Sequence, residues 1–84
     1  MTSPIVHDTP LIPWEQEAAF IESVATHESH ELGVDELLAR GAAADTVAAA
    51  PPARTASAAG IQRRRQRFTH QAQVYRRLAA ERLA

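Results

Sequence analysis

The apolar residues between positions 13 and 32 recur at the spacing of one face of an α-helix. Steps of four, three, four and seven residues separate Trp14, Ala18, Ile21, Ala25 and Leu32. Phe20 and Val24 widen this stripe on one side. Pro13 suits the first turn of a helix, and Gly33 suits the residue that follows a helix. The pattern predicts an amphipathic helix over residues 13–32 that ends at Gly33.

A second apolar stripe runs through the C-terminal third of the chain. Steps of seven, four, three, four and four residues separate Ile61, Phe68, Ala72, Tyr75, Ala79 and Leu83. Val74 and Leu78 broaden it, and the residues between are mostly good helix formers without Gly or Pro. We expect a long amphipathic helix over residues 61–83, within an Arg-rich segment that covers residues 61–84.

The middle of the chain gives weaker signals. A short helix is expected over residues 34–40, with acidic residues in its first turn and Gly41 after its last. Residues 42–50 are alanine-rich and fit either further helical turns or a loop. Residues 51–60 contain two prolines and small residues, which is typical of a linker. Residues 13–50 together are expected to form an acidic helical segment.

Residues 1–12 are expected to form an extended arm. Proline lacks a backbone N–H and restricts the residue before it, and Pro4 and Pro10 lie in this stretch. The arm is more apolar than a solvated tail needs to be, because it contains Ile5, Val6, Leu11 and Ile12. We interpret it as a segment that lies along a partner.

The predicted fold class is all-α, with two main amphipathic helices, one short helix, the arm and the Pro/Ala linker. Hydrophobic residues make up 45% of the chain, but 18 of them are alanine. Leu, Ile, Val and Phe number only 17 of 84 residues, close to the level at which chains fail to fold alone. Cysteine is absent, so no disulfide compensates. We therefore expect no compact globule without a partner.

The formal net charge of −1 hides a strong asymmetry. Residues 1–50 carry nine acids and one Arg (−8), and residues 51–84 carry eight Arg and one acid (+7). Such halves either pair with each other or engage separate surfaces. If the two long helices face each other, Glu17 and Glu28 are expected to meet arginines at the rim of the contact. The arginines expected there are Arg64, Arg65 and Arg82.

Arginines cluster on the C-terminal helix in a way that suits phosphate or acidic surfaces. The candidates are Arg63, Arg64, Arg65, Arg67, Arg76 and Arg77. Several arginines on one helix can follow a nucleic-acid backbone, although no helix-turn-helix or finger signature accompanies them. The favoured interpretation is pairing with acids of the same chain or of a protein partner.

The large side chains of the stripes are the candidate partner-binding anchors, because aromatic residues dominate protein interfaces. They are Trp14, Phe20, Ile21, Phe68, Tyr75 and Leu78. The sequence thus suggests a small non-catalytic accessory or assembly subunit that docks on a larger protein complex or forms a homo-oligomer. The alternative is a small DNA- or RNA-binding regulatory protein that uses the Arg-rich helix.

Other classes of function have little support in the sequence. Without Cys, a nucleophile elbow or a Gly-rich loop, we expect no catalytic site and no cofactor. His27 and His30 are three residues apart with Glu28 and Glu31 beside them, but a polar helix face is the preferred interpretation over a metal site. Without a leader-like N-terminus or a long apolar run, the expected location is the cytoplasm, a virion or another large assembly, away from membranes.

Overall fold

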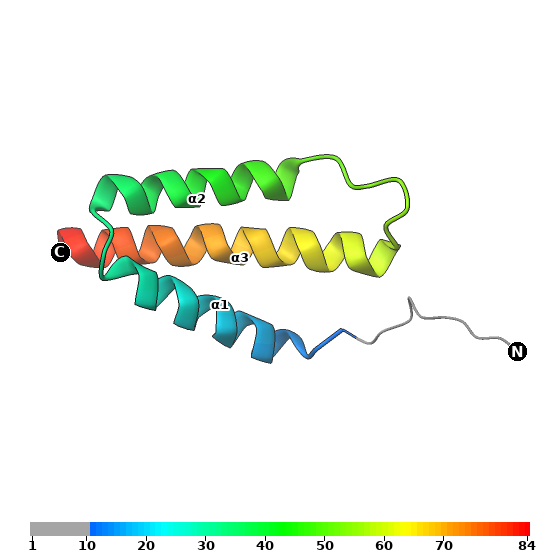
Figure 1. The fold of residues 1–84 in the computed structure, drawn as a ribbon, viewed down its shortest axis with the longest axis horizontal. Helices are drawn as coiled ribbons and strands as arrows, with labels where there is room; N and C mark the ends of the chain where they lie inside the picture. The colour runs from blue at the N-terminus through cyan, green and yellow to red at the C-terminus, as the bar shows by residue number, and fades with distance from the viewer. Residues whose placement is uncertain (1–10) are drawn as a thin grey trace, which may run out of the picture.

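The computed structural model describes residues 11–84, and these fold into three helices without a strand (Figure 1). They are α1 (Trp14–Ser29), α2 (Val34–Ala49) and α3 (Ala58–Leu83). The predicted all-α class is confirmed. Most of the predicted arm, residues 1–10, lies outside the described residues.

The long helix α3 is the central element of the structure. It packs against α2 along one side and against α1 along another. In Figure 1, α1 runs in the same direction as α3, and α2 runs in the opposite direction. Because α3 has 26 residues, it is roughly 39 Å long at 1.5 Å per residue. The radius of gyration, 15.5 Å, exceeds the roughly 12 Å of a compact chain of this length, so the shape is extended.

The helix boundaries differ from the expected ones because of local capping contacts. The Gly60 N–H donates to Ser57 Oγ at 3.0 Å, which starts α3 three residues earlier than expected. The Gly33 N–H donates to Glu36 Oε1 at 2.8 Å. Gly33 has a φ of −81° and caps the start of α2, whereas the sequence predicted that it ends the first helix. That helix already ends at Ser29.

The second helix is not short, so the predicted end at Gly41 is wrong. α2 continues through Gly41 and the following alanines as far as Ala49. Gly41 is buried, and a Cβ added there would lie 3.4 Å from the Ala72 carbonyl oxygen and 3.5 Å from Arg76 Cγ. Ala44 and Ala72 are buried as well. Small residues therefore let α2 approach α3 closely. This close packing, and not the end of a helix, is the role of Gly41.

The apolar core lies where all three helices meet. Its buried residues are Ile21 and Ala25 of α1, Leu37 of α2, and Val74, Tyr75 and Ala79 of α3. Trp14, Leu32, Val34 and Leu78 pack around it while staying partly exposed. Since Leu37 and Val74 are the only large side chains among residues 11–84 with almost no exposure, each contributes a large share of the burial.

Two neighbouring leucines give a matched test of this core. Leu37 is 0% exposed and Leu38 is 46% exposed. Leu37→Ala is expected to lower the free energy of unfolding by about 2–5 kcal/mol, because it leaves a cavity. Leu38→Ala should change it by no more than about 0.5 kcal/mol, as is usual at surfaces. Urea unfolding followed by circular dichroism measures both, and equal losses would contradict the placement of α2.

Candidate interaction surface

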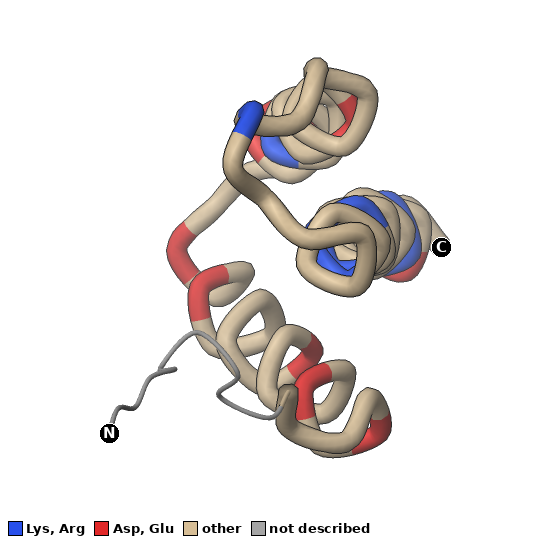
Figure 2. The backbone as a smooth tube through the Cα atoms, turned by 90° about the vertical axis from the view of Figure 1, so that its right-hand side faces the viewer, with Lys and Arg blue, Asp and Glu red and all other residues tan. Residues whose placement is uncertain are grey.

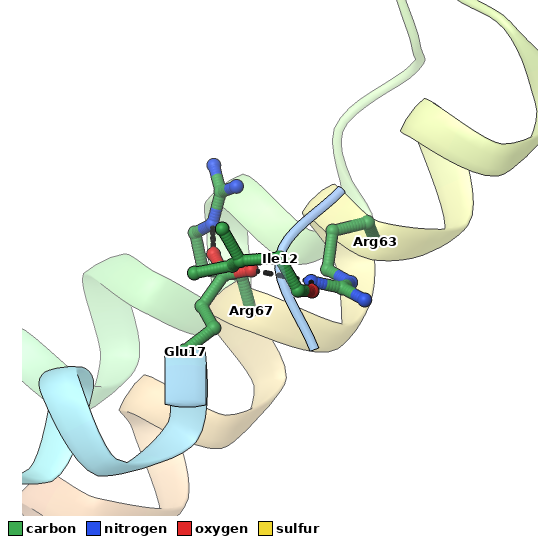
Figure 3. A network of polar contacts seen from close by, with 4 residues as sticks. All are labelled: Ile12, Glu17, Arg63 and Arg67. Atoms are coloured by element: carbon green, nitrogen blue, oxygen red, sulfur yellow. Dashed lines mark hydrogen bonds and ion pairs between the residues drawn. The ribbon is translucent and has the colours of Figure 1, made fainter. Parts of the chain in front are cut away.

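A buried carboxylate fastens the start of α1 to α3 (Figure 3). Glu17 is buried, and its Oε1 accepts a hydrogen bond from Arg63 Nη1 at 2.7 Å. Its other oxygen accepts from Arg67 Nε. The same Arg63 Nη1 also donates to the Ile12 carbonyl oxygen at 2.7 Å, and its guanidinium lies 5.6 Å from the centre of the Trp14 ring. These contacts fix the first turn of α1 and the residues before it.

The environment of Glu17 stabilises its charged form. Burial alone would raise the pKa of the Glu17 carboxyl, but the hydrogen bonds and charges of Arg63 and Arg67 outweigh this effect. The pKa of Glu17 therefore lies below its usual range. Because the carboxylate is paired on both oxygens, α1 can keep a charged group inside its contact with α3.

A second carboxylate joins all three helices near the core. Glu28 Oε1 accepts from the Tyr75 hydroxyl at 2.7 Å and from Arg40 Nη1 at 3.0 Å. Burial, together with the Glu28 carboxylate, holds the pKa of the Tyr75 hydroxyl above its usual value. The expected pairing of Glu17 and Glu28 with Arg64 and Arg65 is thus wrong in its partners.

The remaining contacts continue the same pattern of pairing within the chain. Figure 2 shows acidic positions along α1 and basic positions along α3. Arg82 donates to the carbonyl oxygens of Ser29 and Leu32, at 2.6 and 2.7 Å, and so covers the end of α1. Arg76 pairs with Asp45 of α2, and the nearest contact of Arg77 with Glu22 of α1 is 3.6 Å. The acidic and basic halves therefore meet each other.

Most of the predicted phosphate-binding arginines are engaged in these contacts. Arg63, Arg67, Arg76 and Arg77 each have a carboxylate partner. Arg64 donates to the Val47 carbonyl oxygen at 3.4 Å and lies 5.4 Å from the centre of the Phe68 ring. Only Arg65 among the six makes no polar side-chain contact within residues 11–84. A ligand would have to compete for the others.

The structure divides the predicted anchors into an inner and an outer group. Ile21 and Tyr75 are buried in the core of the chain itself. Trp14, Phe68 and Leu78 are half-buried, and the Trp14 ring packs edge-on against His70 at a centroid distance of 5.5 Å. Phe20 differs from all of them, because it is 68% exposed. An external partner would find Phe20 most readily.

Phe20 belongs to a row of exposed residues on α1, which we name the α1 ridge. The row follows helical spacing, so its side chains project from one side of the helix. The α1 ridge consists of Gln16, Phe20, Val24 and His27, with Glu31 just beyond the helix end. Among these residues, the sequence analysis named Phe20 alone as a partner-binding anchor. The helical spacing of the other residues is evident in the sequence. The sequence does not show, however, which flank of the apolar stripe on α1 stays uncovered by α2.

The two histidines of the predicted cluster lie close to each other at the end of α1. The rings of His27 and His30 lie edge to face with centroids 6.5 Å apart. Within residues 11–84, no three His, Asp or Glu side chains converge as a metal site requires. His70 instead faces α1, where its Nε2 lies 3.3 Å from Glu22 Oε2 without a hydrogen bond.

Similarity to known proteins gives no indication of the function of this chain. Neither a family model, nor a curated protein, nor a solved structure matches the chain. No helix among residues 11–84 combines the length and the apolar character that a membrane span requires.

Replacement of the buried carboxylate tests the junction between α1 and α3. Glu17→Gln is expected to lower the free energy of unfolding by about 1–3 kcal/mol at neutral pH, because it weakens hydrogen bonds to a charged group. Since the pKa of Glu17 is lowered by folding, its contribution is full above the usual carboxyl pKa and is lost as the pH falls through the lowered value. The difference between wild type and variant should therefore shrink in acid.

Glu15→Gln is the matched control, because Glu15 lies in the same turn, is exposed and has no polar side-chain contact within the described residues. Its effect should stay within about 0.5 kcal/mol. Denaturant unfolding between acidic and neutral pH measures both variants. A Glu17→Gln effect no larger than that of the control, or one that does not vary with pH, would show that this carboxylate does not hold α1.

Proposed function

We propose that this chain is a small non-catalytic subunit that works by binding another protein through the α1 ridge. It would act as an accessory or assembly component of a larger complex, in the cytoplasm or within an assembly such as a virion. Its own core takes up the large apolar side chains at the contacts between the helices, and its own carboxylates engage most of the arginines. Among the surfaces that these contacts leave free in residues 11–84, the α1 ridge is the one that carries an exposed aromatic side chain, Phe20.

The observation that carries the proposal is the exposure of Phe20. A phenylalanine that is 68% exposed, with the exposed Val24 one turn further along α1, presents apolar surface to water. Full burial of such a side chain contributes roughly 1.5–3 kcal/mol. Aromatic side chains of this kind are the usual energetic centres of protein interfaces. The polar residues His27 and Gln16 at either end supply a rim.

Native co-purification followed by mass spectrometry tests the proposal. The tagged chain, purified from its natural source, should bring down a defined protein. An untagged copy of the same chain would count as such a protein. Phe20→Ala should reduce its yield at least about tenfold, since loss of a central aromatic anchor commonly costs about 2 kcal/mol or more.

Leu83→Ala is the matched control, because Leu83 is 72% exposed at the far end of α3 and outside the α1 ridge. Its yield of bound protein should equal that of the wild type. Equal yields from the Phe20 variant and from the wild type would refute docking through the α1 ridge.

One observation favours the alternative, nucleic-acid binding through α3. Arg65 is exposed and free of acidic partners among the described residues. It lines an open hollow beside Trp14, together with polar side chains that can hydrogen-bond to base edges. These side chains are Gln62, Gln66, Thr69 and Gln73. The pairing of the other arginines on α3 weighs against this alternative, because phosphate contacts supply most nucleic-acid affinity.

Fluorescence anisotropy with labelled duplex DNA and structured RNA separates the two functions. Protein docking predicts weak nucleic-acid binding that Arg65→Ala leaves unchanged at physiological salt. The alternative predicts binding that falls steeply with salt and is weakened severalfold by Arg65→Ala. That second result would favour the alternative over the proposed function.

A further inference from the structure

We propose that the protein docked on the α1 ridge is a second copy of this chain, with the two ridges antiparallel across a twofold axis. This inference rests on the proposed function, because it names the partner of the same surface. It follows from where the ridge lies and from the charges at its two ends.

The α1 ridge borders an open side of the structure. Glu28, one turn beyond Val24, contacts Arg40 of α2 and Tyr75 of α3, so this flank of α1 faces toward α2. α1 and α2 do not pack along their lengths, and Figure 2 shows them on separate sides of α3. The residues of the ridge before Glu28 are therefore left without a neighbouring helix, and a helix from another molecule can lie against them.

The two ends of the ridge carry opposite charges. Glu17 lies one turn before Phe20 and pairs with two arginines, Arg63 and Arg67. One carboxylate between two guanidinium groups leaves a net positive charge beside the start of the ridge, where the Arg67 side chain is still 41% exposed. Glu31 lies at the other end, is exposed and has no polar side-chain partner within residues 11–84. A surface with a cation at one end and an anion at the other is complementary to itself when one copy is turned by a half rotation.

An antiparallel arrangement satisfies both the apolar and the charged residues of the ridge. With the twofold axis close to position 22, Phe20 of each copy lies opposite Val24 of the other. Gln16 then lies opposite His27 of the second copy. Glu31 of the second copy lies beyond the start of α1, at the level of Arg67 and its neighbours on α3. A parallel arrangement would instead bring Glu31 next to Glu31, which is unfavourable.

Sedimentation equilibrium of the purified chain over micromolar to millimolar concentration gives the first test. The expected result is a reversible monomer–dimer equilibrium. Phe20→Ala and Glu31→Arg should each raise its dissociation constant at least tenfold, while Leu83→Ala leaves it unchanged. Circular dichroism of each variant checks that the helices remain, which is expected because all three residues are exposed. A monomer at every concentration overturns the inference.

Engineered cysteines test the orientation, since the natural chain has none. A mixture of Gln16→Cys and His27→Cys chains should form a mixed disulfide-linked dimer under mild oxidation, and neither variant alone should form one. The control mixture is Glu15→Cys with Thr26→Cys, two exposed positions with the same separation on another side of α1. Linkage of Gln16→Cys to itself would indicate parallel helices, and equal linkage in the control would indicate random collision; either result overturns the proposed arrangement.

The two proposals fail in different ways. If the chain stays monomeric while Phe20→Ala still abolishes co-purification of another protein, the second copy is wrong and the docking function stands. If Phe20→Ala changes neither self-association nor co-purification, the docking function through the α1 ridge fails, and the inference that rests on it fails too.

Discussion

The buried carboxylate of Glu17 is the interaction on which the arrangement of the helices depends. It receives hydrogen bonds from Arg63 and Arg67, so the acidic first turn of α1 lies on the most basic part of α3. Removing a charge from water is unfavourable unless it is paired, and this requirement allows few positions for α1. Together with the pairs that Arg76 and Arg77 make, this contact brings the two oppositely charged halves of the chain together. It also decides which flank of α1 remains exposed.

Small side chains allow α2 and α3 to pack at close distance, which large apolar side chains would prevent. Gly41, Ala44 and Ala72 are buried between α2 and α3, where a Cβ on Gly41 would already touch the backbone of α3. Close packing gains dispersion energy even without bulky side chains. The alanine-rich stretch of α2 therefore contributes to the packing of the fold. Because α1 joins this pair through one junction of mixed polar and apolar contacts, Phe20 and Val24 are left outside.

Periodicity in the sequence predicted the all-α class and both apolar stripes, because helical spacing is a local property. The roles of Gly33 and Gly41 were mispredicted, since a glycine that ends a helix and a glycine that allows close packing look alike in a sequence. The partners of Glu17 were predicted wrongly, because arginines flank the stripe of α3 on both sides. Only the side on which α1 lies selects Arg63 and Arg67 over Arg64 and Arg65. The exposure of Phe20 also depends on how α1 lies against α3, which the local sequence does not determine.

The most direct test of this account is the distance between α1 and α3 in solution. Spin labels on Ser23→Cys and Gln73→Cys, both at exposed positions, can be measured by double electron–electron resonance. The labelled chain is diluted into excess unlabelled chain, so that only distances within one molecule contribute. The account predicts a single narrow, short distance distribution in wild type that broadens in Glu17→Gln. A broad distribution in wild type, or one that Glu17→Gln leaves unchanged, would contradict it.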